Sequence, residues 1–207
     1  MITLYGHPVS SNSRKVHWAL EELGLPYIYQ TVDLMKGEHK GPAFLGKNPN
    51  GRVPVLDDQG IVLFESNAIL WYLADRYGPG KIVPESAAQR ALVHQWVSWQ
   101  ASDFGPAIMS PWLTLFYARV AGAPFDEAKL RHACEAAGRP LGILEGALDK
   151  AYVAGEAFSI ADIALAESFA LCDSARIDTA SYPKLRAWLG RLSGRPAHVK
   201  TRPGEAR

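Results

Sequence analysis

The chain has 207 residues, of which 48% are hydrophobic and 21% are charged, and its formal net charge is +1. This length suffices for one domain or two small ones with a buried core, and the composition excludes a disordered chain. No apolar run approaches the ~18 residues that a membrane helix needs, and the near-zero net charge gives no reason to expect a nucleic acid partner.

The N-terminal stretch predicts a strand, a polar loop and a helix. Residues 2–5 form a short apolar run, and residues 6–13 are mostly polar or turn-forming. A helical face follows at the spacing i, i+3, i+4, i+7, and Gly24 marks its end. The face consists of Val16, Ala19, Leu20 and Leu23. Residues 27–32 then predict a second strand.

The next segment combines features that suit the binding of a small peptide. Residues 53–56 and 61–64 predict two strands around a turn at 57–60. Pro54 cannot donate to a strand ladder, so Val53 can offer its backbone to an extended ligand instead. Glu65-Ser66 opens the next helix, where free N–H groups and the helix dipole favour a carboxylate. This combination suits a zwitterionic peptide.

The order of elements over the first 77 residues is strand, helix, strand, short helix, strand, strand, helix. A parallel pair joined by a helix, followed by a terminal hairpin, is a thioredoxin-like order. The polar loop lies at the carboxyl end of the first strand, where open α/β sheets place ligands.

A Gly/Pro-rich stretch at 78–84 predicts a domain boundary, beyond which the chain reads as helical. A long helix from about residue 87 is expected to bend near Gly105-Pro106, with Leu92, Trp96 and Trp99 on one face. A second long helix is expected from about 125 to 150.

The last third of the chain carries helix signals and a polar tail. Ser159 and Asp162 form a capping box, with Phe158 and Ile163 placed for a hydrophobic staple, which we interpret as a folding signal. A final amphipathic helix starts at Pro183, and the tail from Gly194 is expected to be loosely held. Cys134 and Cys172 form no CxxC motif and are expected to be reduced core thiols of a cytosolic protein. No signal-peptide pattern occurs in MITLYG.

Three stretches in this order resemble a known family: LYGHPVSSNSRKVHWALEELGLPY, KGEHKGPAFLGKNPNGRVPVL and LFESNAILWYLADRYG. The chain resembles a cytosolic glutathione S-transferase of the theta-like or general bacterial branch, with a serine-type active-site loop. The resemblance implies a thioredoxin-like α/β domain at 1–78 and a linker at 79–86. It also implies an all-α domain at 87–207, which carries the electrophile pocket and part of a dimer interface.

The chemistry that the resemblance implies is activation of the glutathione thiol. A thiol with a pKa of ~8.5 is mostly protonated at neutral pH, and hydrogen bonds to sulfur at a helix N-terminus lower that value. Ser10 matches the serine of theta- and phi-like transferases, and Ser11 and Asn12 are competing donors. Residues of this type usually cap a helix, so capping remains an alternative role for the whole loop.

The resemblance also assigns the glutathione contacts. Glu65 faces the γ-glutamyl amine and Ser66 its carboxylate, Val53 pairs its backbone with the cysteinyl part, and Pro54 matches the family's cis-proline. His39 and Arg52 lie where relatives hold the glycyl carboxylate. Solvated surface positions are the alternative for His39 and Arg52.

Further expectations concern the second domain. Ala101-Ser102-Asp103 resembles a segment that touches glutathione across a homodimer in beta-like enzymes. The alternative for Asp103 is a helix position facing solvent or a cleft. An electrophile pocket is expected from Phe104, Ile108 and Trp112, although aromatic residues at helical spacing are usually core. Other candidates for its lining are Trp99, Met109 and Phe116.

The function implied is conjugation of glutathione to apolar electrophiles in cytoplasmic detoxification. Reduced glutathione is then a co-substrate, and no cofactor, metal, nucleic acid or membrane partner is expected. Ser10 stands where beta-like enzymes carry cysteine, which excludes a mixed disulfide at that residue, and the Ser-Ser-Cys signature of zeta-like isomerases is missing. The alternatives are a nu-like disulfide or peroxide reductase assisted by Asn12, and a non-enzymatic regulator or scaffold.

Overall fold

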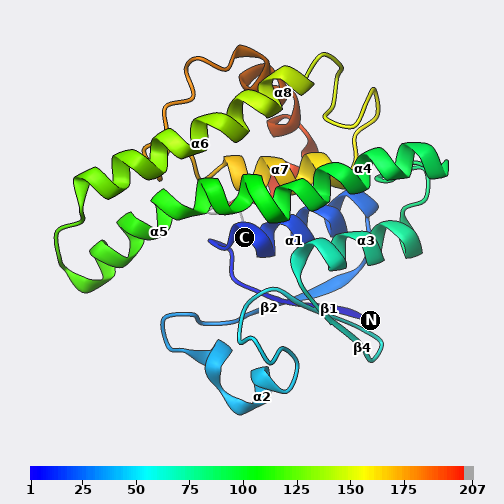
Figure 1. Cartoon of the computed structure of the whole chain (residues 1–207). Coiled ribbons are helices and arrows are strands. Elements are labelled where there is room, and N and C mark those ends of the chain that lie inside the picture. The colour runs from blue at the N-terminus through cyan, green and yellow to red at the C-terminus, as the bar shows by residue number, and fades with distance from the viewer. Residues whose placement is uncertain (203–207) are drawn as a thin grey trace. The chain divides into compact units, whose positions relative to one another are not determined.

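The computed structural model describes residues 1–202, and it divides the chain into two compact units. The first unit comprises Met1–Ser86 together with the segment that begins at Ser193, and the second comprises Ala87–Leu192 (Figure 1). None of the helices among residues 1–202 is long and apolar enough to cross a bilayer.

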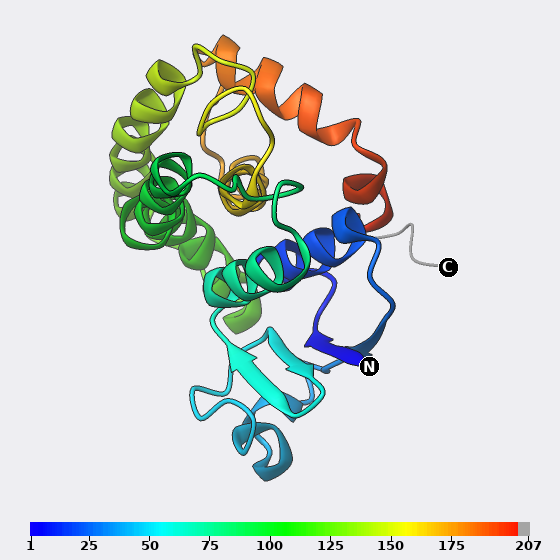
Figure 2. The ribbon, with the colours of Figure 1, turned by 90° about the vertical axis from the view of Figure 1, so that its right-hand side faces the viewer.

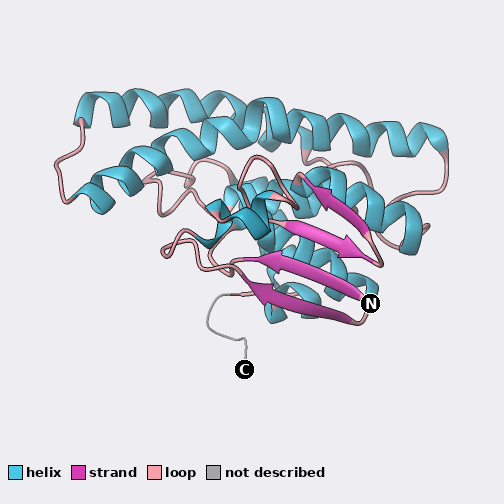
Figure 3. Ribbon diagram, turned by 90° about the horizontal axis from the view of Figure 1, so that it is seen from below, coloured by secondary structure: helices cyan, strands magenta, loops and turns pink. Residues whose placement is uncertain are grey.

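The first unit is built on a four-stranded sheet with the order β2-β1-β3-β4 (Figure 3). Its strands are β1 (Ile2–Gly6), β2 (Tyr27–Thr31), β3 (Val55–Asp58) and β4 (Ile61–Phe64). β1 and β2 are parallel, whereas β3 pairs antiparallel with both β1 and β4. The predicted thioredoxin-like topology is therefore confirmed.

The turn between β3 and β4 is shorter than the expected turn at residues 57–60. β3 starts at Val55, after the cis Val53–Pro54 bond, and continues through Asp58. Only Gln59 and Gly60 remain as the turn, both with positive φ (55° and 95°), the backbone that a two-residue type I′ hairpin needs. The aspartates that we expected in the turn lie in β3, because the ladder with β4 continues to the pair Asp58–Ile61.

Helices cover both faces of the sheet. α1 (Ser11–Leu23) and α3 (Ser66–Tyr77) lie together on one face, and α2 (Pro42–Leu45) lies on the other (Figures 1 and 2). Successive side chains along each strand point to opposite faces of the sheet, so the strands contribute to the hydrophobic core on each face. Val55 packs with Phe44 of α2, so the fully buried Leu56 faces α1 and α3.

The tail departs from the expectation of a loosely held segment within the second domain. α9 (Pro196–Lys200) packs against α1. Arg195 makes a bidentate ion pair with Glu22 at 2.6 and 2.8 Å, and Lys200 pairs with Glu21 at 3.0 Å. The polar residues of the tail hold it in place, because their positive charges pair with Glu21 and Glu22 of α1.

The second unit is helical. α4 (Ala87–Trp99) continues through a π-helical turn, Gln100–Phe104, into α5 (Gly105–Ala121), and α6 (Glu127–Ala147) runs antiparallel beside α5 (Figure 1). The irregular turn precedes the predicted bend at Gly105. A Cβ at Gly105 would lie 2.7 Å from the backbone oxygen of Gln100, so this turn requires glycine.

The predicted face of α4 is not the buried one. Leu92 is 47% exposed, and Trp96 and Trp99 are half-buried with their rings in edge contact, centroids 5.3 Å apart. The side chains fully inside are Val93 and Val97. The two valines therefore mark the core face of α4. In the sequence, the larger apolar side chains of Leu92, Trp96 and Trp99 made a different face look more hydrophobic.

The central helix of this unit is α7 (Ile160–Phe169), which is buried over its whole length and packs against α4 and α5. The predicted capping box of Ser159 and Asp162 is confirmed. α8 (Pro183–Ser193) starts at Pro183 as predicted. Both cysteines are free, Cys172 buried and Cys134 half-buried, and burial raises the pKa of the Cys172 thiol to about 12.

Candidate active site

The loop between β1 and α1 is closed by Ser13. Its backbone N–H donates to Ser10 Oγ at 3.3 Å, and its own Oγ accepts from the backbone N–H of His7 at 3.2 Å. Ser10 N–H in turn donates to the His7 carbonyl at 2.9 Å. Because Ser13 is fully buried, it fixes both ends of the loop and thereby the direction of the Ser10 side chain.

Ser10 therefore caps α1 and still has a proton to give. Its Oγ accepts from the helix, but its hydroxyl donates to no group among residues 1–202. The side chain is half-buried, whereas Ser11 is only 7% exposed. A hydroxyl donor at the positive end of a 13-residue helix suits a thiolate or another anion, and Ser10 offers it with better access than Ser11.

Asn12 connects two segments that are far apart in sequence. Its Oδ1 accepts a hydrogen bond from the hydroxyl of Ser66 at 3.2 Å, across 54 positions. This bond brings the N-terminus of α1 beside the N-terminus of α3, with Ser10 on one and Glu65–Ser66 on the other. The amide N–H groups of Asn12 have no acceptor within the described chain and remain available to a ligand.

Glu65 has an unusual backbone conformation at the start of α3. Its φ is 70° and its ψ is 109°, although it is not a glycine. Such outliers cost about 1–3 kcal/mol and concentrate at functional sites. The exposed carboxylate makes no capping bond to the helix, so it can face a cation, while the positive end of α3 favours an anion.

Val53 offers an unpaired backbone edge. It precedes the cis-proline Pro54, as the resemblance implied, and its side chain packs into the core shared by Val55 and Phe44. Neither its N–H nor its C=O forms a hydrogen bond within residues 1–202. An extended peptide can therefore pair with it as an added strand would.

His39 and Arg52 belong to one tightly turned segment. Lys40 Nζ donates to the Gly51 carbonyl at 2.9 Å, and Asn48 Nδ2 donates to the Arg52 carbonyl at 2.7 Å. A Cβ at Gly51, where φ is +57°, would lie 2.8 Å from the His39 carbonyl, so only glycine permits this approach.

The two side chains differ in their surroundings. His39 is half-buried, and its Nδ1 has no partner in the part of the chain described. Burial, with a contribution from the Lys40 charge, lowers the pKa of His39. The Arg52 side chain is exposed and positive. Both can approach an anionic group, His39 as a neutral donor and Arg52 as a charge.

The residues predicted in the second unit have mixed outcomes. Ser102 and Asp103 are both exposed on the π-helical turn, where the Ser102 hydroxyl donates to the Asp103 carboxylate. Phe104 and Ile108 are fully buried. A side chain without exposed surface cannot line an open pocket, so Phe104 and Ile108 are corrected to core residues. Trp112 is half-buried and stacked on Phe116, centroids 4.9 Å apart.

Two features were missed at the level of sequence. Ser13 was interpreted as one of several capping residues, although the spacing Ser10-x-x-Ser13 is the cap-to-third-residue spacing that could have singled it out. The contact of Asn12 with Ser66 has no local signal. No cluster of three or more His, Cys, Asp or Glu side chains suited to a metal occurs among residues 1–202.

The candidate site thus consists of two neighbouring helix N-termini and the unpaired backbone of Val53 in a thioredoxin-like domain. Two family models match the chain, "Glutathione S-transferase, N-terminal domain" at residues 1–75 and "Glutathione S-transferase, C-terminal domain" at residues 106–196. The chain belongs to the glutathione S-transferase family, and the resemblance predicted from its motifs is confirmed.

Individual relatives cover nearly the whole chain. The glutathione S-transferase GstB of Escherichia coli (strain K12) is 33% identical over 200 residues, 95% of each chain. The crystal structure of glutathione transferase F7 from Populus trichocarpa matches with a TM-score of 0.91, at 30% identity and 100% of both chains. A theta class enzyme from Xanthomonas axonopodis pv. citri, solved with glutathione bound, matches with a TM-score of 0.89 at 35% identity, covering 97% of this chain and 96% of that one.

Proposed function

We propose that the protein is a glutathione transferase that conjugates the thiolate of reduced glutathione to electrophilic, mostly apolar small molecules. The observation that carries this proposal is the hydrogen bond from Ser66 to Asn12. It holds the hydroxyl donor of Ser10 and the Glu65–Ser66 pair on neighbouring helix N-termini. Glutathione would need two such neighbouring sites, one for its thiol and one for its γ-glutamyl end.

Ser10 acts on the sulfur. The hydroxyl donates to the thiolate, and its oxygen is already occupied by the N–H of Ser13, so the donor direction is fixed before the ligand arrives. Each unit by which the thiol pKa falls corresponds to about 1.4 kcal/mol of preference for the thiolate. The thiol proton leaves to solvent, the sulfur forms a bond to the electrophilic carbon, and the displaced group leaves with the electron pair.

The rest of the peptide is held by the remaining predicted contacts. Glu65 pairs with the γ-glutamyl amine, and Ser66 with the first amides of α3 receives the adjoining carboxylate. Val53 pairs its backbone with the cysteinyl unit, and His39 with Arg52 attracts the glycyl carboxylate. Support comes from the exposed Glu65 carboxylate and from the unpaired backbone of Val53.

The second unit supplies the electrophile site and a dimer contact in this proposal. Trp112 offers aromatic surface to an apolar electrophile. Asp103, oriented by Ser102, approaches the γ-glutamyl amine of the second copy in a twofold homodimer. We place the enzyme in the cytoplasm, in detoxification, and without a cofactor, on the ground that its relatives are glutathione S-transferases.

The test compares Ser10→Ala with Asn12→Ala, using Ser181→Ala as the control at an exposed serine outside the site. Glutathione binding is measured by calorimetry, and the thiol pKa by thiolate absorbance against pH. Ser10→Ala is expected to raise the thiol pKa and to slow conjugation about a hundredfold, with the binding constant changed less than about threefold.

Other outcomes reassign the site. Activity that survives Ser10→Ala and falls with Asn12→Ala would make Asn12 the donor. Absence of glutathione binding by the unmodified protein at millimolar ligand would overturn the enzyme proposal and favour a scaffold. A rise in rate with disulfide substrates but none with carbon electrophiles would favour reduction over conjugation.

A further inference from the structure

The helix that runs from α4 into α5 contains one irregular segment, Gln100–Phe104, which we call the π turn. Its closing hydrogen bond runs from the Gly105 N–H to the Gln100 carbonyl, five residues back instead of four. Turns of this kind are rare and occur frequently at functional sites. The residues that produce and hold the π turn therefore bear on what it presents to a ligand.

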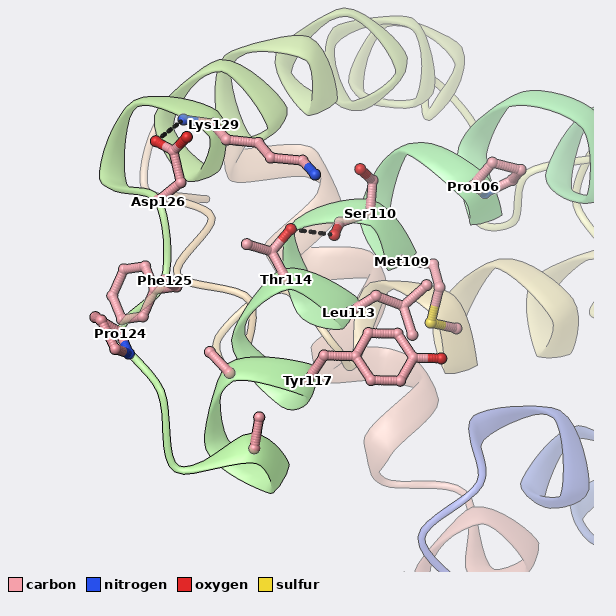
Figure 4. A pocket seen from close by; sticks show the side chains of 12 residues that line it. Pro106, Met109, Ser110, Leu113, Thr114, Tyr117, Pro124, Phe125, Asp126 and Lys129 are labelled. Atoms are coloured by element: carbon pink, nitrogen blue, oxygen red, sulfur yellow. Dashed lines mark hydrogen bonds between the residues drawn. The ribbon is translucent and has the colours of Figure 1, made fainter.

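Two residues at the start of α5 explain why the helix widens here. Pro106, which Figure 4 shows at the beginning of α5, has no N–H to donate, and its ring crowds the carbonyl four positions earlier, that of Ser102. A π turn contains one residue more than an α turn and avoids this clash. Gly105 leaves room for the Gln100 side chain, because a Cβ there would lie 2.7 Å from the Gln100 Nε2.

Gln100 fastens the π turn to the interior of the second unit. Its side chain is 5% exposed, and its Nε2 donates to the hydroxyl of Ser168 at 2.8 Å. The Ser168 hydroxyl in turn donates to the Ala164 carbonyl at 3.2 Å. Val97 and Phe104, the neighbouring buried positions of the same helix, are apolar. A buried amide between them needs hydrogen-bond partners, and it finds them on α7, which is buried over its whole length.

The outer side of the π turn carries the Asp103 carboxylate. Residues 101–103 are exposed, whereas Phe104 is fully buried. The Ser102 hydroxyl reaches the Ser98 carbonyl at 3.2 Å and also donates to the Asp103 carboxylate. Asp103 forms no ion pair within residues 1–202. The backbone of the π turn and the Ser102 hydroxyl therefore set the direction of this carboxylate.

We propose that Gln100 is a positioning residue for Asp103. Its hydrogen bond to Ser168 holds the π turn in one conformation, and the turn then directs the Asp103 carboxylate toward the γ-glutamyl ammonium bound in the second copy. This inference rests on the proposed function, which gives Asp103 that contact. A carboxylate that is already held in one direction loses less conformational entropy on binding. Gln100 therefore acts on glutathione affinity and leaves the chemistry at the sulfur to Ser10.

The test compares two variants that remove the same hydrogen bond from opposite ends. Gln100→Leu removes the amide from the π turn, and Ser168→Ala removes its partner on α7 without changing any residue of the turn. Each is expected to raise the KM for glutathione about threefold to tenfold, with kcat and the pKa of the bound thiol unchanged. Asp103→Asn should raise the same KM by at least as much, because it removes the carboxylate itself.

A peptide without the ammonium separates positioning from a general loss of structure. Glutaryl-cysteinylglycine keeps the carboxylates and the thiol of glutathione but lacks its amine. Gln100→Leu and Ser168→Ala should bind this peptide as tightly as the unmodified protein does, because the contact that they disturb is missing. The double variant of Gln100→Leu and Asp103→Asn should bind glutathione no more weakly than Asp103→Asn alone, since both changes act through one carboxylate.

Gln95→Leu is the matched control, because it removes an exposed glutamine of α4 and should change neither affinity. Circular dichroism and gel filtration must show that each variant is folded and has the same assembly state. If Gln100→Leu does not fold, Ser168→Ala decides the test.

Two results would overturn the role of Gln100 while the unmodified protein still conjugates glutathione. One is an equal loss of affinity for both peptides in Gln100→Leu and Ser168→Ala, which would assign the bond to the stability of the second unit. The other is an unchanged KM for glutathione in both variants. A lack of conjugation by the unmodified protein would instead overturn the proposed function, and this inference with it.

Discussion

Helices α1 and α7 each begin with a serine cap, and the two caps differ in what their hydroxyl groups do. Ser159 at the start of α7 is 1% exposed and belongs to a complete capping box. Ser10 at the start of α1 is half-buried, and no acidic residue follows it in the first turn of the helix. The local motif is similar, yet one cap serves folding and the other is suited to chemistry.

The difference lies in where each hydroxyl proton goes. The Ser159 hydroxyl donates to the Asp162 carboxylate at 3.1 Å, and the same carboxylate accepts from the Ser159 N–H at 2.9 Å. The Ser10 hydroxyl oxygen accepts from Ser13, and its proton has no acceptor among residues 1–202. A serine cap without an acid at the third helical position therefore keeps a donor for a ligand.

α1 lacks the acid that completes the cap of α7, and its contacts with the tail lie at its later turns. Arg195 of the tail pairs with Glu22, and the ring of His198 lies 4.4 Å from that of Trp18. Trp18 also donates to Glu22 at 2.8 Å. The helix α1 of the candidate site is thus held along its later turns, and its first turn keeps the Ser10 hydroxyl as a donor.

Removing the acid of the α7 box should have the largest effect. Asp162 also accepts from the Val153 N–H at 3.0 Å and from the Trp188 indole N–H at 2.9 Å. Asp162→Ala leaves these buried donors without partners, at a cost of about 1–3 kcal/mol each. We expect the free energy of unfolding to fall by about 4 kcal/mol, measured by urea denaturation.

Asp149→Ala serves as the matched control, because Asp149 is an aspartate of the same unit whose side chain is 76% exposed in an ion pair with Lys184. It should leave the denaturation midpoint unchanged. If both variants unfolded at the same urea concentration, α7 would not depend on its box and the contrast with α1 would fail.

The two serines themselves should give the next largest effects, on different measurements. Ser159→Ala is expected to lower the free energy of unfolding by about 2 kcal/mol with the rate per folded molecule unchanged. Ser10→Ala should lower stability by less than about 1 kcal/mol while conjugation slows about a hundredfold. Equal losses of stability in the two variants would show that Ser10 is mainly a structural cap.

The sequence predicts most of the elements because their signals are local. The strand runs, Gly24, Pro183 and the box at Ser159 each act through neighbouring residues, and each element is present. The face of α4 was misjudged because Leu92 and the tryptophans outweigh Val93 and Val97 in any local count of apolar residues. Only packing decides which face of an apolar helix is buried.

The candidate active site likewise combines residues with local sequence signals and contacts between distant parts of the chain. Ser10, Glu65 and Pro54 stand in recognisable motifs, so their neighbourhood could be predicted. The bond from Ser66 to Asn12 spans 54 positions, and the tail reaches α1 from more than 170 positions away. Contacts at such separations depend on the whole topology, and no single stretch of residues encodes them.

The fastening of α1 by the tail should depend on pH. Burial, aided by the Arg202 charge, lowers the pKa of His198 from 6.5 to about 4. Above pH 6.5 the side chain is neutral in both states, and its packing on Trp18 has its full effect. As the pH falls from 6.5 toward 4, the unfolded state takes up the proton first, so stability declines across that window.

Thermal unfolding across this pH range tests the assignment. His198→Gln should flatten the decline between pH 6.5 and 4, whereas His132→Gln, at an exposed histidine of the second unit, should preserve it. A decline of the same slope in all three proteins would assign the pH dependence to other groups and would leave the tail without a titrating contact on α1.

The smallest effect expected is the coupling free energy between Asn12 and Ser66. This coupling tests whether the hydrogen bond between α1 and α3 is part of the proposed glutathione site. The bond at 3.2 Å joins two partly exposed helix ends, so a double-mutant cycle of Asn12→Ala and Ser66→Ala should give about 0.5–1.5 kcal/mol in stability. The same cycle on glutathione affinity should give coupling of the same sign, because the proposed ligand contacts both helix N-termini.

Asn12→Asp keeps the acceptor for Ser66 but brings a negative charge near the proposed position of the sulfur. It should therefore restore the stability coupling while raising the pKa of the bound thiol. A thiol pKa that does not change in Asn12→Asp would mean that Asn12 lies away from the sulfur and serves only to join α1 to α3.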